Sequence, residues 1–264
     1  MDITSPAKIK VFWQPGCSSC LRTKEFLASQ GIDFEAIDVH NDPDGMAQLI
    51  ALGARSVPVV AVGNRYTFCQ SMRDVVKFLG LKTKLKDALP AEQLVAKLDL
   101  VMTAAARYLR QLTEEQSREY FRDRKRSPGG LAFHVFRVAE LGMQTAQGIE
   151  LRPDGFKDVP PPDWTREDIA RWGEDVQQRV RTWWQNEPDK TLEYDVTTYY
   201  GRRPMHEVFE RTAWHAAQHT RQIMLILETL GITPAQPLTA SDLAGLPLPN
   251  EVWDIQNKGF NEPG

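Results

Sequence analysis

The sequence predicts an α/β domain with the element order βαβαββα, followed by an all-α four-helix bundle. Residues 8–80 alternate short apolar runs with helical patterns, and from Ala91 the apolar residues recur at helical spacing through four long segments. The stretch 82–90 is polar and fits neither pattern. A chain of 264 residues is long enough for two domains that each bury a core. We therefore expect domains at 1–81 and 91–264, joined by a linker at 82–90.

Residues that favour turns or caps bound the elements of the first domain. Gly31 ends the first helix, Gly63 and Asn64 form a hairpin turn, and Ser71 is expected to cap the last helix. The predicted strands are 9–13, 34–39, 57–62 and 66–68, and the predicted helices are 18–30, 42–53 and 71–79.

The second domain is predicted to be helical, because Gly or Pro ends each of its long periodic segments. These segments are 91–112, 130–147, 165–186 and 205–231, which suggests a four-helix bundle. The stretch 192–200 has the pattern of a strand. The tail after Gly231 has too many prolines for a helix. We expect it to pack along the bundle as an extended strap, with apolar anchors at Leu246, Leu248 and Trp253.

Composition and charge exclude several classes of protein. Apolar and charged fractions of 42% and 25% are those of a soluble globular chain. A net charge of −3 lacks the positive excess that is typical of proteins that bind nucleic acid. The basic cluster Arg122, Arg124, Lys125 and Arg126 is expected to be a solvated helix end, because Asp123 interrupts it.

No segment has the roughly 18 consecutive apolar residues of a membrane span, and the N-terminal residues lack the layout of a signal peptide. Three cysteines do not make a disulfide framework. We therefore expect a cytoplasmic protein without nucleic-acid or membrane partners.

A thiol site is predicted at Cys17 and Cys20, which are separated by Ser18-Ser19 and follow the first strand. A cysteine at the start of a helix lies near unpaired backbone N–H groups, which stabilise the thiolate and lower its pKa. Cys20 lies about one turn further on and is placed to resolve a mixed disulfide formed at Cys17. In Ser56-Val57-Pro58, a cis proline would present backbone edges beside the sulfur.

These motifs and the βαβαββα order closely resemble a glutaredoxin over roughly residues 7–80. The resemblance implies a thioredoxin-like fold with Cys17 as the nucleophile. It also implies that the backbone around Val57, Pro58 and Ser71 receives glutathione or a peptide strand. The chain departs from the family at Ser18-Ser19, where a Pro-aromatic pair is usual, and at Cys69-Gln70-Ser71-Met72, where many members have a Gly-Gly turn.

Two alternatives concern the other cysteine of this domain. Cys69 is either a third thiol near the site or a buried, inert residue, and we expect the second. A structural zinc site built on Cys17 and Cys20 would need four protein ligands, and Cys69 and His40 stand at unsuitable spacing. The redox interpretation is therefore favoured.

A metal site is predicted in the bundle. His215 and His219 are four residues apart, so they point the same way from one helix, and His134 lies on another. Three neutral imidazoles from two helices leave open positions for water or substrate on the metal. His206 is on the opposite face and is excluded. Gln222 lies one turn beyond His219, where it either reaches a metal-bound water or is a polar core residue.

The helix pattern, the segment Trp214-His215 to Gln222-Ile223 and the tail from Leu246 to Asp254 resemble the DinB-like family of four-helix metalloproteins, over roughly residues 91–256. The resemblance implies that His134, His215 and His219 are the metal ligands. Members of that family include transferases and an isomerase that depend on low-molecular-weight thiols. Such a site suits zinc, nickel, iron and copper alike, and we expect zinc or nickel.

Three hypotheses for function follow. The first is a thiol-dependent metalloenzyme, in which glutathione or another low-molecular-weight thiol attacks an electrophile in a transferase or isomerase step and the glutaredoxin-like domain handles thiols or disulfides. The second is a disulfide oxidoreductase whose bundle is a targeting or dimerising module. The third is a sensor in which thiol oxidation changes metal occupancy. Bundles of this kind often pair, so a homodimer is one expectation.

Overall fold

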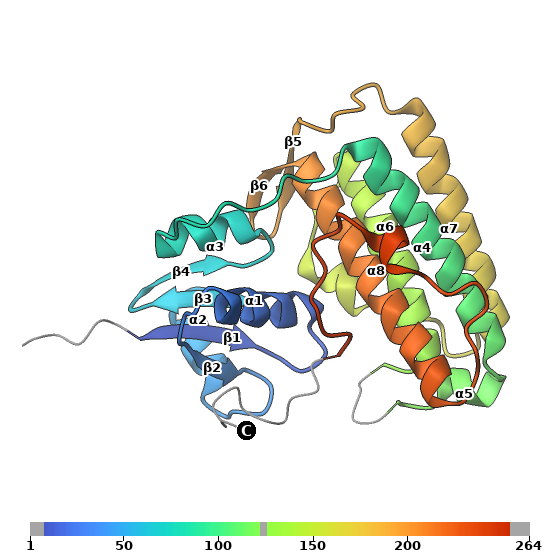
Figure 1. Ribbon diagram of the computed structural model, residues 1–264, viewed down its shortest axis with the longest axis horizontal. Coiled ribbons are helices and arrows are strands. Elements are labelled where there is room, and N and C mark those ends of the chain that lie inside the picture. The colour runs from blue at the N-terminus through green and yellow to red at the C-terminus, as the bar shows by residue number, and fades with distance from the viewer. Residues whose placement is uncertain (1–7, 122–125, 254–264) are drawn as a thin grey trace, which may run out of the picture. The chain divides into compact units, whose positions relative to one another are not determined.

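The structure, a computed structural model, divides into two compact units (Figure 1). It describes residues 8–121 and 126–253. The first unit runs to Lys86 and includes the chain from Pro249, and the second unit is Asp87–Leu248. The N-terminal residues considered as a targeting signal, residues 122–125 of the basic cluster and Asp254 of the tail motif lie outside the described residues.

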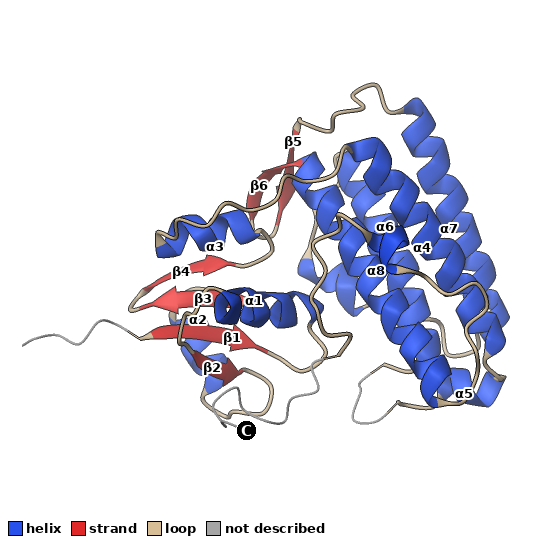
Figure 2. Cartoon of the chain, viewed as in Figure 1, coloured by secondary structure: helices blue, strands red, loops and turns tan. Residues whose placement is uncertain are grey.

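The first unit has the predicted order of strands and helices. Its strands are β1 (Ile9–Trp13), β2 (Glu35–Asp38), β3 (Val59–Val62) and β4 (Arg65–Phe68), and its helices are α1 (Ser18–Ser29), α2 (Gly45–Ala51) and α3 (Met72–Leu79). The strands form one sheet in the order β2-β1-β3-β4, in which β1 is parallel to β2 and antiparallel to β3. Figure 2 shows helices on both faces of this sheet.

Alternation of side chains along the strands gives this sheet two apolar faces. Phe12 and Val59 contribute to one core cluster, together with Leu49 of α2. Their neighbours Val11 and Val60 contribute to the other, which contains residues of α1 and α3. Successive side chains of a strand point to opposite faces, so a run of apolar residues is buried on both sides.

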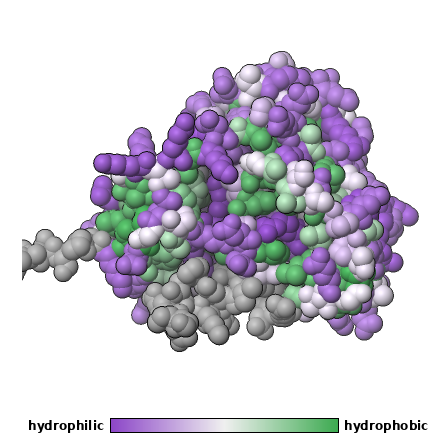
Figure 3. All heavy atoms as spheres, viewed as in Figure 1, coloured by the Kyte–Doolittle hydropathy of each residue, from purple (hydrophilic) through white to green (hydrophobic). Residues whose placement is uncertain are grey.

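Four long helices form the second unit, as predicted. They are α4 (Ala91–Gln111), α6 (Pro128–Ala146), α7 (Arg166–Asn186) and α8 (Met205–Thr229). Both α4 and α6 pack against α7 and α8. Hydrophilic side chains (purple) predominate along the outer edge of this unit in Figure 3, which agrees with helices that bury an apolar stripe. None of the helices that the structure describes combines the length and apolar character needed to cross a bilayer.

Several short elements of this unit were not predicted. They are α5 (Glu114–Arg118), the 3₁₀ helix η1 (Pro153–Lys157), the strand β6 (Gly201–Pro204) and α9 (Ala240–Leu243). The strand predicted at 192–200 contains β5 (Asp195–Thr198), which pairs with β6 in a hairpin. The proline-rich tail does contain one turn of helix, α9, because Thr239 and Asp242 form a capping box at its start.

The tail follows the expected strap only in part. Up to Leu248 it belongs to the second unit, where Arg107 donates to the carbonyls of Ala235 at 2.7 Å and of Gln236 at 2.8 Å. From Pro249 the chain groups with the first unit instead. Trp253, expected as an anchor on the bundle, is buried with 4% exposure and lies in the part of the tail that groups with the first unit.

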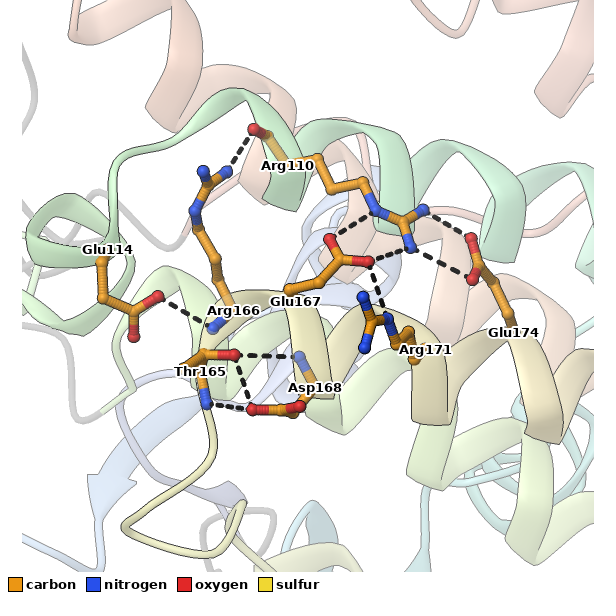
Figure 4. Close-up of polar contacts among 8 residues, drawn as sticks. All are labelled: Arg110, Glu114, Thr165, Arg166, Glu167, Asp168, Arg171 and Glu174. Carbon is orange, nitrogen blue, oxygen red and sulfur yellow. Dashed lines mark hydrogen bonds and ion pairs between the residues drawn. The ribbon is translucent and has the colours of Figure 1, made fainter.

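Ion pairs and a capping box fix the start of α7 against α4 (Figure 4). Arg110 of α4 binds Glu167 at 2.9 Å and also pairs with Glu174, and these contacts raise the pKa of its guanidinium. Thr165 and Asp168 form the capping box of α7. Helix α7 then passes so close to α6 that a methyl group on Gly173 would lie 2.3 Å from the Phe136 ring. Such close packing gives α6, which carries His134, a fixed position.

Candidate functional site

Cys17 and Cys20 form a disulfide at the start of α1. Cys17 is the N-cap residue of this helix, and its sulfur accepts a hydrogen bond from the Cys20 N–H at 3.1 Å. Cys17 is partly exposed, whereas Cys20 is fully buried. An incoming sulfur therefore reaches Cys17, and the buried Cys20 is left for an intramolecular step.

The topology places the other predicted residues of the thiol site at the same edge of the sheet. Phe12 of β1 pairs with Val59 of β3, so the chain leaving β1 toward Cys17 lies beside the chain that enters β3 from Pro58. The Val57–Pro58 peptide is cis. No hydrogen bond within the described residues engages the backbone of Val57, while the Pro58 carbonyl accepts from Cys69 N at 3.1 Å.

Ser71 stands at the N-cap position of α3, as predicted, but its side chain makes no capping bond. The expected cap is therefore corrected: the residue starts the helix without satisfying its N–H groups. Since β4 ends at Phe68, which pairs with Val59, Ser71 also belongs to the edge that carries the disulfide. Cys69 is free and has 1% exposure, and burial raises its pKa, so it is an inert core residue.

A buried lysine lies beside the thiol site and was not predicted. Lys24 follows Cys20 by one turn of α1 and has 1% exposure. Its ammonium group lies 3.7 Å from the centre of the Trp13 ring, at the end of β1. Stacking of the ammonium group on an aromatic ring offsets part of the cost of its desolvation.

The three predicted histidines converge inside the bundle. His134 comes from α6, and His215 and His219 come from α8. One ligand atom of each lies within 4.8 Å of those of the other two. The side chains are 4%, 8% and 4% exposed, respectively. His206, excluded on helical phase, instead contacts the Leu89 carbonyl through Nε2 at 2.9 Å.

The three imidazoles differ in whether Nδ1 has a hydrogen-bond partner. Nδ1 of His219 lies 2.7 Å from Oε1 of Gln222, which accepts, so Nδ1 carries the proton and Nε2 keeps its lone pair. Gln222 is therefore a polar core residue, one of the two expected alternatives, and its hydrogen bond fixes the tautomer of His219. Nδ1 of His134 and Nδ1 of His215 are buried without a partner in the described chain. Unsatisfied buried nitrogens beside a third imidazole fit a metal ion that has three histidine ligands.

Burial keeps these imidazoles neutral, the form that binds metal. Desolvation is the largest cause, and it holds the pKa values of His134 and His215 well below the usual 6.5. For His219 the same cause lowers the pKa to about 4, although the Gln222 hydrogen bond acts in the opposite direction. At neutral pH the lone pairs are therefore available for coordination.

Three further side chains surround the triad, and sequence reasoning missed all of them. Phe156 of η1 lies with its ring centre 6.0 Å from that of His215 and 6.4 Å from that of His134. Arg211 lies over the Phe156 ring at 4.9 Å, and Arg126 donates to the Phe156 carbonyl at 2.6 Å. Arg126 was expected in a solvated helix end, but its Nη1 is buried. Arg211 had a signal, because it precedes His215 by one helical turn.

Comparison with known proteins divides the chain in the same way. The Glutaredoxin family model matches residues 9–67, and the DinB superfamily model matches residues 97–223. Among curated proteins, the Gene 56 protein of Mycobacterium phage L5 is 42% identical over 55 residues, which are 20% of this chain and 53% of that protein. Glutaredoxin-like protein NrdH of Escherichia coli (strain K12) is 35% identical over 57 residues, which are 22% of this chain and 70% of NrdH.

Proposed function

Because this chain belongs to the glutaredoxin family in its first domain and to the DinB superfamily in its second, we propose that it is a thiol-dependent metalloenzyme with its own thiol–disulfide oxidoreductase domain. The convergence of His134, His215 and His219, with two buried Nδ1 atoms left unpartnered, carries this proposal. We place the protein in the cytoplasm, where thiols stay reduced.

The histidines bind zinc or nickel in this proposal. A divalent metal held by three imidazoles supplies a Lewis acid that lowers the pKa of a bound thiol or water. Gln222 keeps the His219 ring in one orientation, and burial of the three rings excludes water. The thiol is glutathione or another low-molecular-weight thiol. In a transferase reaction its thiolate sulfur bonds to an electrophilic carbon while the bond from that carbon to a leaving group breaks and the group departs with the electron pair; in an isomerase reaction the sulfur adds to a double bond and is expelled again as thiolate when the double bond re-forms.

The first domain exchanges thiols and disulfides. The Cys17 thiolate attacks one sulfur of a disulfide and releases the other as a thiolate. The Cys20 thiolate then attacks the Cys17 sulfur, which frees the second thiol and closes the Cys17–Cys20 disulfide. Two molecules of a low-molecular-weight thiol return the two electrons. The edge formed by Val57, Pro58 and Ser71 binds the incoming thiol or peptide.

Metal content is the first test. Protein purified without a histidine tag is loaded with zinc or nickel and measured by elemental analysis, as wild type and as the His134→Ala/His215→Ala/His219→Ala variant. His206→Ala is the matched control, because it removes a histidine of α8 outside the triad. We expect one equivalent of metal in the wild type and control and none in the triple variant. Equal metal content in the wild type, the control and the triple variant would disprove the proposed site.

Activity separates the two domains. Conjugation of glutathione to a model aryl halide should disappear in His215→Ala and survive in Cys17→Ser, if the bundle alone performs the transfer. Reduction of a model disulfide should disappear in Cys17→Ser and survive in His215→Ala.

The disulfide at Cys17 and Cys20 favours a second candidate, an oxidoreductase whose bundle targets, dimerises or senses. Disulfide reduction that is unaffected by chelators, without any conjugation activity, would support it. Release of metal on oxidation of the cysteines would support the sensing form.

A further inference from the structure

Two arginines, the buried Arg211 and the half-buried Arg126, stand beside the histidine triad without an ion-pair partner among the described residues. Arg211 is 7% exposed and precedes His215 by one turn of α8, so both point from the same face. Its Nη2 donates to the Tyr199 hydroxyl at 3.3 Å, and its guanidinium lies over the rings of Phe156 and Tyr200. Its Nε is buried and has no hydrogen-bond partner.

Arg126 reaches the same place from the residue before the cap of α6. Its Nη2 donates to the Phe156 carbonyl at 2.6 Å, so both arginines contact Phe156, the residue that stacks on His215. The Nη1 of Arg126 is buried without a partner. The pair therefore offers two free N–H donors, Nη1 of Arg126 and Nε of Arg211, next to the three imidazoles.

The nearby acids act on this site through their charges without pairing with either arginine, and Glu207, one turn before Arg211 on α8, acts on Tyr200 in this way. Neither arginine has an ion pair within residues 8–121 and 126–253. Asp158, the acid that acts on Arg126 through its charge, is bound to Arg137 at 2.8 Å. The imidazoles are neutral, and a divalent metal would add two further positive charges. A cation without an ion pair is costly to bury, so this arrangement favours binding of an anion from outside the chain.

We propose that Arg126 and Arg211 bind a carboxylate of the molecule that reacts at the histidine site. The preferred ligand is therefore a thiol or an electrophile that carries a carboxylate close to its reacting atom. Arginine suits this role because its planar fork presents parallel N–H donors to two oxygens. The inference rests on the proposed metal site for the reacting group, but the arginines bind the carboxylate whether or not the metal is present.

Two small thiols of matched size test the selectivity. 3-Mercaptopropionate carries a carboxylate where 2-mercaptoethanol carries a hydroxyl, and titration calorimetry on the zinc-loaded protein gives the dissociation constant of each. We expect 3-mercaptopropionate to bind roughly tenfold to hundredfold more tightly, as one charge-assisted contact predicts. Arg211→Gln and Arg126→Gln should each remove most of this preference. Arg202→Gln is the control, because Arg202 is exposed and loses the same charge.

A third probe identifies which reactant supplies the carboxylate. Maleate, an electrophile without a thiol, is titrated into protein saturated with 2-mercaptoethanol. Tight binding of maleate that depends on Arg211 assigns the carboxylate to the electrophile, and a preference only for 3-mercaptopropionate assigns it to the thiol. Arg211→Lys, which keeps the charge without the fork, covers the case in which Arg211→Gln does not fold.

The proposal is overturned if neither anionic probe binds more tightly than 2-mercaptoethanol in the folded wild type, or if all three arginine variants lose affinity equally. Zinc content is measured on every sample. A protein that holds no zinc but still binds maleate through Arg211 would disprove the proposed metal site and leave the carboxylate site standing. A protein that holds zinc without preferring anions would disprove the carboxylate site and leave the proposed metal site standing.

Discussion

The hydrogen bond between Gln222 and His219 should control the affinity of the triad for metal. Oε1 of Gln222 accepts from Nδ1 at 2.7 Å, and both side chains are 4% exposed. Gln222→Leu would let the His219 ring rotate and would make its Nε2 a weaker donor to the metal. Partners of this kind are worth about tenfold to hundredfold in affinity.

This range corresponds to about 1.4 to 2.7 kcal/mol of binding free energy. Competition with a coloured zinc chelator measures the affinity directly. The variant Gln222→Glu is the matched comparison, because its carboxylate still accepts from Nδ1 and raises the basicity of the ring. We expect Gln222→Leu to bind zinc more weakly than wild type and Gln222→Glu to bind at least as tightly.

Loss of the acceptor also leaves a buried N–H unsatisfied, which by itself costs about 1–3 kcal/mol of folding stability. Denaturation of metal-free wild type and variant therefore accompanies the affinity measurement. Only the difference between the metal-bound and metal-free effects reports on coordination. Unchanged zinc affinity in a folded Gln222→Leu protein would refute the reasoning that this bond orients a ligand.

Three other outcomes follow from the structure. Cys20→Ser should accumulate a mixed disulfide at Cys17, visible as added mass in intact-protein mass spectrometry, whereas Cys17→Ser should form none. Between pH 7 and pH 4 the metal-free protein should lose about 3 kcal/mol of unfolding free energy through His219 alone. The reason is that the pKa of His219 is 6.5 in the unfolded chain and about 4 in the folded protein, so the unfolded chain binds the extra proton as the pH falls. Denaturant titrations of His219→Gln at both pH values should show a smaller loss than wild type, and an equal loss would contradict the assignment. Gly173→Ala should destabilise the bundle by about 1–3 kcal/mol, because the added methyl overlaps the Phe136 ring by more than the helix propensity of alanine offsets, and a more stable variant in the same titration would contradict it.

The element order and the histidine cluster could be predicted from the sequence because both depend on local periodicity. Alternation predicted the strands of the sheet, and the four-residue spacing of His215 and His219 put them on one face of α8. His134 joined them because its helix was also readable. In a regular helix or strand, the spacing of two residues along the chain determines whether their side chains point in the same direction.

The rest of the site depends on tertiary contacts that leave no periodic pattern. Phe156 lies on a short 3₁₀ helix in a proline-rich connection, and Arg126 in a basic cluster, and each meets the histidines only because α6 and α8 bring distant segments together. The grouping of the tail from Pro249 with the first unit also has no periodic signal in the sequence. Glu25 of α1 accepts from the backbone of Asn250 at 2.6 Å, a contact between residues 225 positions apart.

The two sites accept different partners, and this limits how they act together. Cys17 is partly exposed, so the disulfide exchange is open to sulfur on a protein or on a small molecule. The histidine site admits much less, because its three imidazoles are at most 8% exposed and Arg211 and Phe156 stand beside them. On the proposed function and the proposed carboxylate site, a small anionic thiol is a reactant that would fit both sites. We infer that a diffusible thiol of this kind links the two domains, with its local concentration raised by their fusion in one chain.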